Sequence, residues 1–303
     1  MRAIQKAGLR VIVDPMYGVG EVAMNMVLTE ARCRVRIIHE HRNPLFGGRS
    51  PAPSMDALRM LSFYVKDEGY DLGVATDGDA DRVAIVDEHG EYVLMNDILL
   101  LIYYYLLQGR GGRGGVVRNV ATTHLLDRLA RHFGETCYEV PVGFKHITKA
   151  MLDHDAILGG ESSGGLAIRG HILGKDGILA AALIIEMLAR TGKTISELRQ
   201  QVYDLTGRMY SAEKNVPATP EMKIIVPRQL REAQVKQIRD YPVLRVSHDD
   251  GTKFYLDHDN WVLLRFSGTE LLLRIFCEAD TPQKAQELID WGKELIQLEK
   301  FVS

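Results

Sequence analysis

Apolar residues in the first two thirds of the chain follow two alternating patterns. Short, mainly apolar runs, at residues 9–13, 35–38 and 72–75, are typical of buried strands. Segments 21–30 and 55–66 lie between these runs and carry apolar residues three or four positions apart, which predicts amphipathic helices. Strands that alternate with helices indicate parallel βαβ units, whose ligand-binding loops follow the carboxyl ends of strands. We therefore expect an α/β fold with functional loops at such ends.

The pattern continues after a glycine-rich segment, residues 109–115, which we interpret as a flexible domain linker. The further α/β elements are expected at residues 116–120, 123–132, 157–158, 178–189 and 195–203. From residue 243 four strands follow one another, at 243–246, 252–256, 261–266 and 271–277. A last helix is expected from Thr281, as N-cap, and Pro282 to about Glu299. The prediction is two mixed α/β three-layer domains, 1–108 and 109–207, and a small α+β C-terminal domain, 208–303.

Composition adds few constraints. The 303 residues are 46% hydrophobic and 25% charged, with a net charge of -3, which is typical of a globular protein and not of a basic nucleic-acid binder. No apolar run approaches the roughly 20 residues that a membrane-spanning helix needs. The three cysteines are far apart and lack metal-ligand spacing, so a reducing, cytoplasmic location is expected.

Three aspartates, Asp77, Asp79 and Asp81, follow the third expected strand at alternate positions. Alternate residues of an extended chain point the same way, so the carboxylates can converge on one cation, and oxygen ligands favour magnesium, calcium or manganese over zinc. The alternative is a solvated hairpin turn, since Asp-Gly is a common turn dipeptide, and the motif alone leaves both open. An EF-hand calcium loop is excluded, because its sixth position is Arg82 instead of glycine.

A second loop with a candidate chemical role spans residues 159–165, which include four glycines. Its G-x-S-x-G pattern, centred on Ser162, is that of a hydrolase nucleophile elbow, but the elbow needs a helix directly after it and residues 166–168 look extended. We favour a polyol-binding loop, in which Glu161 and Ser163 bind hydroxyl groups. A glycine-rich surface loop remains the alternative.

The third loop, residues 265–270, lies between two expected strands. Its backbone N–H groups and hydroxyls, with Arg265 and Arg274, form a plausible phosphate cradle. A hairpin turn with Arg265 paired to Glu270 is equally compatible with these residues. Lys145 adds a cation on another loop, although surface lysines are common. A sugar phosphate and a divalent cation together would satisfy all three loops.

Five segments are similar, in order, to motifs of the α-D-phosphohexomutases, the family of phosphoglucomutase and phosphomannomutase. They are residues 14–18, 77–82, 142–145, 160–164 and 265–270 with Arg274. The resemblance implies phosphate transfer between the 1- and 6-positions of a hexose phosphate, with a hexose 1,6-bisphosphate as intermediate and activator.

The resemblance also implies roles for individual residues. Mg2+ is expected on Asp77, Asp79 and Asp81. The substrate is expected on Glu161, Ser163, Arg265, Ser267, Gly268, Thr269 and Arg274. The catalytic group is expected to include Arg82, Lys145 and His171. His171 is included because Gly165 stands where some members carry histidine, and some relatives place a histidine a few residues beyond this loop. A separate departure from the family motifs is Leu271, which stands where a proline is common.

The family has four domains, and the resemblance covers the last three. The first domain carries a serine that becomes phosphorylated, in a Thr-Ala-Ser-His-Asn-Pro-like segment that is absent from these 303 residues. We expect the chain to be inactive alone, to need the missing N-terminal phosphoserine domain as its partner, and to bind Mg2+ weakly. The alternatives are a non-catalytic sugar-phosphate-binding or assembly protein and, third, a serine hydrolase using Ser162. These residues favour neither a particular hexose nor an oligomeric state.

Overall fold

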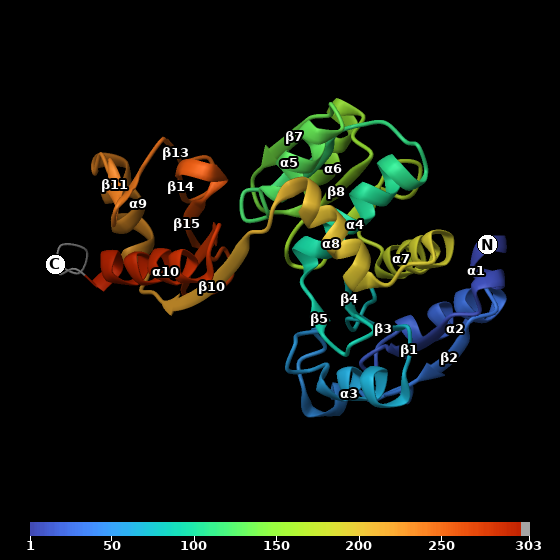
Figure 1. The fold of residues 1–303 in the computed structure, drawn as a ribbon. Coiled ribbons are helices and arrows are strands. Elements are labelled where there is room, and N and C mark those ends of the chain that lie inside the picture. Colours follow the sequence, from blue (N-terminus) through green and yellow to red (C-terminus); the bar gives the residue numbers. More distant parts are fainter. Residues whose placement is uncertain (298–303) are drawn as a thin grey trace. The chain divides into compact units, whose positions relative to one another are not determined.

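The computed structural model describes residues 1–297, and Figure 1 shows their helices and strands. The chain divides into two units of densely packed residues. The first unit holds residues 1–118, 126–138 and 143–206. The second begins at Gly207 and also includes two short segments from the middle of the chain, 119–125 and 139–142.

The first sheet has the strand order β2-β1-β3-β4-β5. Its strands are β1 (Arg10–Asp14), β2 (Arg34–Ile37), β3 (Leu72–Thr76), β4 (Val83–Val86) and β5 (Tyr92–Val93). β1 is parallel to β2 and β3, because α2 (Gly20–Glu30) and α3 (Arg59–Glu68) provide the crossovers. β4 runs antiparallel to β3, so the sheet is mixed. A short helix, α1 (Arg2–Ala7), precedes β1.

The core of this sheet explains its sequence pattern. All residues of β3 and β4 are buried, so both strands read as unbroken apolar runs. α3 packs Leu61 and Val65 into a cluster with Ile12 and Ala75. The helix expected at 55–66 begins later, at Arg59, although Ser54 Oγ still accepts a hydrogen bond from Ala57 N at 3.3 Å.

The second sheet has the order β7-β6-β8-β9. Its strands are β6 (Val116–Asn119), β7 (Cys137–Val140), β8 (Leu158–Gly160) and β9 (Leu166–Ile168). β6 and β8 are parallel, and β9 returns antiparallel to β8. The accompanying helices are α4 (Met95–Tyr104), α5 (Leu125–His132), α6 (Phe144–His154), α7 (Gly177–Thr191) and α8 (Ile195–Thr206).

The glycine-rich segment after α4 is not the flexible linker that we expected. α4 continues into a π-helical turn, Tyr105–Gly109, and Gly112 N then donates to Leu106 O at 2.9 Å. A Cβ on Gly112 would lie 2.8 Å from Leu106 O, and one on Gly115 would lie 2.5 Å from Thr136 O. The glycines therefore permit close packing. The domain boundaries at 108 and 207 stay predictions.

The second unit contains an antiparallel sheet of order β10-β16-β15-β14-β13. Its strands are β10 (Tyr210–Pro217), β13 (Arg245–Ser247), β14 (Thr252–Tyr255), β15 (Trp261–Phe266) and β16 (Leu272–Ala279). Two helices, α9 (Met222–Glu232) and α10 (Pro282–Gln297), and a small hairpin of β11 (Gln237–Ile238) and β12 (Tyr241–Pro242) complete it. Leu288 and Ile289 of α10 join the core with Val262 and Ile275.

The two mid-chain segments of the second unit are attached by apolar and charged contacts. Val120 and Ala121 pack with Trp261 and Leu263. Lys253, only 2% exposed, donates from Nζ to Val120 O at 2.7 Å and to Glu139 Oε2 at 2.6 Å.

The predicted fold class is confirmed, with two mixed α/β sheets followed by an α+β region. α9 was not predicted, because Pro227 lies inside it and prolines normally interrupt helices. Thr281 Oγ1 accepts from Lys284 N at 3.2 Å, as an N-cap does, whereas the expected end of α10 at Glu299 lies outside the described residues. In the part of the chain that the structure describes, each helix is too short or too polar to cross a membrane.

Candidate functional site

The three aspartates lie in a hairpin loop that joins β3 to the antiparallel β4. Thr76 and Val83 are register partners, so residues 77–82 form the loop. The hairpin of the alternative interpretation is therefore present, but that interpretation also expects a solvated turn. Asp77 is only 1% exposed, which a freely solvated turn does not explain.

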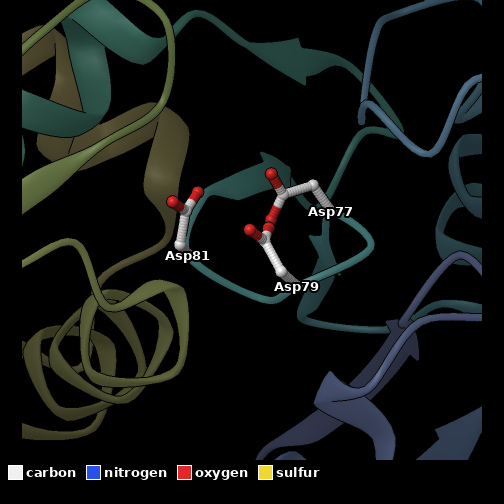
Figure 2. Close-up of side chains that lie close together, drawn as sticks. All are labelled: Asp77, Asp79 and Asp81. Atoms are coloured by element: carbon white, nitrogen blue, oxygen red, sulfur yellow. The ribbon is translucent and has the colours of Figure 1, made fainter.

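The carboxylates of this loop converge. One oxygen from each of Asp77, Asp79 and Asp81 lies within 4.8 Å of the others. Figure 2 shows the carboxylates of Asp77 and Asp79 side by side, with that of Asp81 on the other arm of the loop. Asp81 Oδ1 is buried and accepts no hydrogen bond from the described residues. Three hard oxygen donors, one of them buried without a hydrogen bond, fit a cation such as Mg2+.

Two basic side chains balance part of the negative charge. Arg82 donates from its backbone N to Asp77 Oδ1 at 3.0 Å and from Nε to Asp77 Oδ2. Its Nε also lies 3.8 Å from Asp81 Oδ1. Lys175 Nζ forms an ion pair with Asp81 Oδ2. Arg82 thus lies beside the aspartates, and its catalytic role stays a prediction, whereas Lys175 was not predicted.

The start of α7 adjoins the same loop. Gly177 N donates to Ala80 O at 3.1 Å, and a Cβ on Gly177 would lie 2.5 Å from Arg82 O. Asp176 is the N-cap of α7, since its Oδ1 accepts from Leu179 N at 2.9 Å. The positive end of the helix dipole thus lies beside the acidic loop, where negative charge is favoured.

The loop after β1 supports the acidic loop from the other side. Val19 N donates to Gly78 O, and Gly78 N donates to Pro51 O, both at 3.1 Å. Asp14, at the end of β1, accepts from Met16 N at 2.8 Å and pairs with His39. Burial raises the pKa of Asp14, and the adjacent His39 opposes this rise. The two backbone hydrogen bonds of Gly78 attach the acidic loop to these neighbouring loops.

The glycine-rich loop joins β8 to β9 within the same unit. Glu161 N donates to Gly165 O at 3.0 Å, and Gly164 N donates to Glu161 O at 3.2 Å, which closes a tight turn. Ser163 is exposed and available for a ligand. A Cβ on Gly164 would lie 3.1 Å from Arg82 Cβ, so this loop touches the acidic loop. A strand follows it, which excludes a nucleophile elbow at Ser162.

The two other predicted catalytic residues, Lys145 and His171, lie outside the acidic loop. Lys145 is exposed in the first turn of α6, next to Phe144, whose Cε2 lies 3.4 Å from a Cβ built on Gly165. His171 is exposed, and its Nε2 lies 2.9 Å from Asp176 Oδ2. The catalytic roles of Lys145 and His171 stay predictions. Lys175 is the residue that reaches the acidic loop from this segment.

The predicted phosphate loop lies in the second unit, between β15 and β16. Arg265 and Arg274 are register partners, so both side chains leave the same face of the sheet. Each is paired to a carboxylate: Arg265 Nε to Asp250 at 2.9 Å, and Arg274 to Glu270 Oε2 at 2.8 Å. The alternative pair of Arg265 with Glu270 is not formed. Two adjacent arginines with exchangeable partners can hold a doubly charged anion.

The tip of this loop is shaped by Ser267. Its Oγ accepts from Glu270 N at 3.2 Å and from Thr269 N at 3.4 Å, and its backbone O accepts from Lys223 Nζ at 2.9 Å. Gly268 and Thr269 are exposed, and a Cβ on Gly268 would meet no atom within 4 Å. The turn therefore leaves open space above the backbone at Gly268.

Comparison with known proteins agrees with these features. The models of the phosphoglucomutase/phosphomannomutase family match in order: α/β/α domain II at residues 1–90, α/β/α domain III at 95–205, and the C-terminal domain at 213–290. A phosphoglucomutase/phosphomannomutase of Thermococcus kodakarensis is 34% identical over 98% of the chain. A probable phosphoglucosamine mutase of Methanopyrus kandleri is 33% identical over 96%.

Solved structures agree in fold. A phosphoglucomutase/phosphomannomutase family protein of Burkholderia thailandensis superposes with a TM-score of 0.81 over 99% of this chain and 64% of its own, at 20% identity. The chain spans 62% of the length of each of the two curated relatives. The matched family domains and the order of the three loops lead to one conclusion: the chain belongs to the phosphoglucomutase/phosphomannomutase family, the α-D-phosphohexomutases.

Proposed function

We propose that this chain provides the metal-, sugar- and phosphate-binding parts of a phosphohexomutase, which interconverts a hexose 1-phosphate and a hexose 6-phosphate through a hexose 1,6-bisphosphate. The observation that carries the proposal is the convergence of three aspartate oxygens within 4.8 Å in a loop that also contacts the glycine-rich loop. A cation site and a hydroxyl-binding loop are thereby adjacent in one unit, as phosphoryl transfer to a sugar requires.

Each group has a distinct task. Asp77, Asp79 and Asp81 would hold Mg2+, which when bound neutralises charge on a transferring phosphoryl group. Glu161 accepts hydrogen bonds from sugar hydroxyls, and Ser163 donates hydrogen bonds to them or accepts hydrogen bonds from them. The phosphate that is not transferred is bound by Arg265, Ser267, Gly268, Thr269 and Arg274. To do so, Arg265 and Arg274 exchange their carboxylate partners for phosphate oxygens, with which guanidinium groups also form bidentate pairs.

The phosphoryl carrier is the remaining requirement. No Thr-Ala-Ser-His-Asn-Pro-like segment occurs in residues 1–303. We therefore expect that these residues alone bind a hexose phosphate but do not turn it over, and that a phosphorylated first domain supplied in trans restores turnover. The curated relatives are named for glucose, mannose and glucosamine phosphates, so all three sugars belong in the assay.

A coupled mutase assay with Mg2+ and glucose 1,6-bisphosphate tests this. The expected result is no turnover by residues 1–303, turnover on adding the phosphorylated first domain of a relative, and its loss in Asp79→Ala. Turnover by residues 1–303 alone that Asp79→Ala abolishes would contradict the need for a separate carrier.

A non-catalytic sugar-phosphate-binding protein is the second candidate, because the two arginines of the phosphate loop are adjacent register partners that could bind an anion without the acidic loop if they left their carboxylates. Calorimetric titration with glucose 6-phosphate separates the two. If the chain binds glucose 6-phosphate but shows no turnover with any added first domain, the binding protein is favoured.

A further inference from the structure

Lys175 forms an ion pair with one of the three aspartates of the acidic loop. Its ammonium group pairs with Asp81 Oδ2, whereas Oδ1 of the same carboxylate accepts no hydrogen bond from the described residues. Both side chains are partly shielded, with 28% of Lys175 and 26% of Asp81 exposed. A divalent cation that used this carboxylate would meet a positive charge already bound to it.

The side chain of Lys175 reaches Asp81 by packing closely over Gly165. A Cβ on Gly165 would lie 2.3 Å from Lys175 Cδ and 2.8 Å from its Cγ, distances that real side chains do not adopt. Gly165 is not among the residues with positive φ, so backbone conformation does not demand a glycine here. The need is space: the aliphatic part of Lys175 crosses Gly165 on its way to Asp81.

The charges of the loop are balanced unequally. Arg82 satisfies both oxygens of Asp77 through two hydrogen bonds, and its Nε lies farther from Asp81, at 3.8 Å. Asp79 is exposed to water. Lys175 is thus the direct partner of Asp81, the aspartate with a buried oxygen that accepts no hydrogen bond from described residues.

We propose that Lys175 is the internal counter-ion of the metal site: it neutralises Asp81 while no divalent cation is bound, and its positive charge beside this carboxylate lowers the affinity of the site for a cation. Because Gly165 has no side chain, it leaves the space that the aliphatic part of Lys175 needs. This inference rests on the proposed metal site and adds a positioning residue to it. Lys175 acts on the cation through its charge and through Asp81.

Calorimetric titration of the intact chain with Mg2+, without sugar phosphate, tests the proposal. Removal of a like charge next to the cation should tighten binding by about tenfold, so Lys175→Met is expected to bind Mg2+ more strongly than the wild type. Lys175→Arg keeps the charge and is expected to stay within about twofold of the wild type, as rescue by a conservative change. Thermal melting shows that each variant is folded.

Gly165→Ala tests the same inference without removing a charge. Its Cβ displaces Lys175, so this variant is expected to approach the affinity of Lys175→Met. The double variant is expected to gain nothing further, because both changes act on one ammonium group. This second route keeps the test decisive if Lys175→Met fails to fold.

The outcomes separate this inference from the metal site itself. If the wild type binds Mg2+, Asp81→Asn weakens it, and both Lys175→Met and Gly165→Ala bind no more tightly than the wild type, then the counter-ion proposal is wrong and the metal site stands. If neither the wild type nor any of these variants binds Mg2+, both are wrong. Tighter binding in either variant supports the counter-ion.

Discussion

Gly18 shows how a single residue fixes the position of the acidic loop. It lies in the loop after β1, where a Cβ would be 2.6 Å from Gly78 O, 2.8 Å from Gly78 Cα and 3.0 Å from Asp77 O. All three atoms belong to backbone, which cannot swing aside as the end of a side chain can. A side chain at position 18 must therefore move the loop that carries the aspartates.

Gly18→Ala is accordingly expected to lower the free energy of unfolding by about 1–3 kcal/mol, the usual cost of an overpacked site, and to weaken Mg2+ binding. Gly174→Ala is the matched control for stability, since the nearest atom to its Cβ would be 3.7 Å away. Urea unfolding and calorimetry measure the two effects. Equal stability of the two variants would contradict the close contact.

At the residue scale, the sequence was informative where the interacting residues are close together in the chain. The aspartates at alternate positions could be recognised, because their spacing alone lets them converge. Lys175 could not, because its role depends on the space above Gly165 and on a loop far earlier in the chain. The lysine lies shortly before the helix that we expected at residues 178–189.

Among the elements, α7 depends on its N-cap as well as on its apolar face. Asp176 Oδ1 accepts from Leu179 N at 2.9 Å, which satisfies one of the free N–H groups of the first turn. The same turn donates from Gly177 N to the acidic loop. Loss of the cap therefore affects both the helix and its contact with the loop.

Asp176→Ala is expected to lower the free energy of unfolding by about 0.5–2 kcal/mol, whereas Asp176→Asn should retain most of it, because asparagine caps helices as well as aspartate does. Thermal or urea unfolding followed by circular dichroism distinguishes the two. An alanine variant as stable as the asparagine variant would mean that the cap contributes little.

Helices and strands were predictable where only one face is buried. Where both faces are buried, the sequence pattern left the strand pairing ambiguous. β3 and β4 are buried throughout, so neither shows the alternation that would reveal an antiparallel pair. The hairpin between them was therefore one of two open interpretations. α9 escaped prediction for another reason: Pro227 removes one N–H bond, yet Val226 and Leu230 still reach the core of the second unit.

At the scale of the whole molecule, the second unit is not a continuous stretch of chain. Residues 119–125 and 139–142 belong to it through packing against Trp261 and through the buried ion pair of Lys253 with Glu139. Such long-range attachment leaves no trace in local spacing. The order of elements gave the fold class, but it could not assign these two segments.

Lys253→Met is expected to destabilise the second unit strongly, by about 3 kcal/mol, because it leaves Glu139 charged and without its ammonium partner in a mostly buried place. Adding Glu139→Gln to this variant should recover part of the loss. Urea unfolding followed by the fluorescence of Trp261, which lies 4.4 Å from Lys253 Nζ, measures both variants. No recovery in the double variant would show that the charge of Glu139 is not the cause.

The register of the β3–β4 hairpin has a consequence for how the acidic loop can vary over evolution. Thr76 opposite Val83 leaves six positions for the loop, and the side chains of both strands are packed in the core. An inserted or deleted residue would either shift a buried strand by one position, turning its side chains to the wrong face, or move one aspartate out of step with the others. The loop can therefore tolerate exchange of residues between its aspartates far more readily than a change in length.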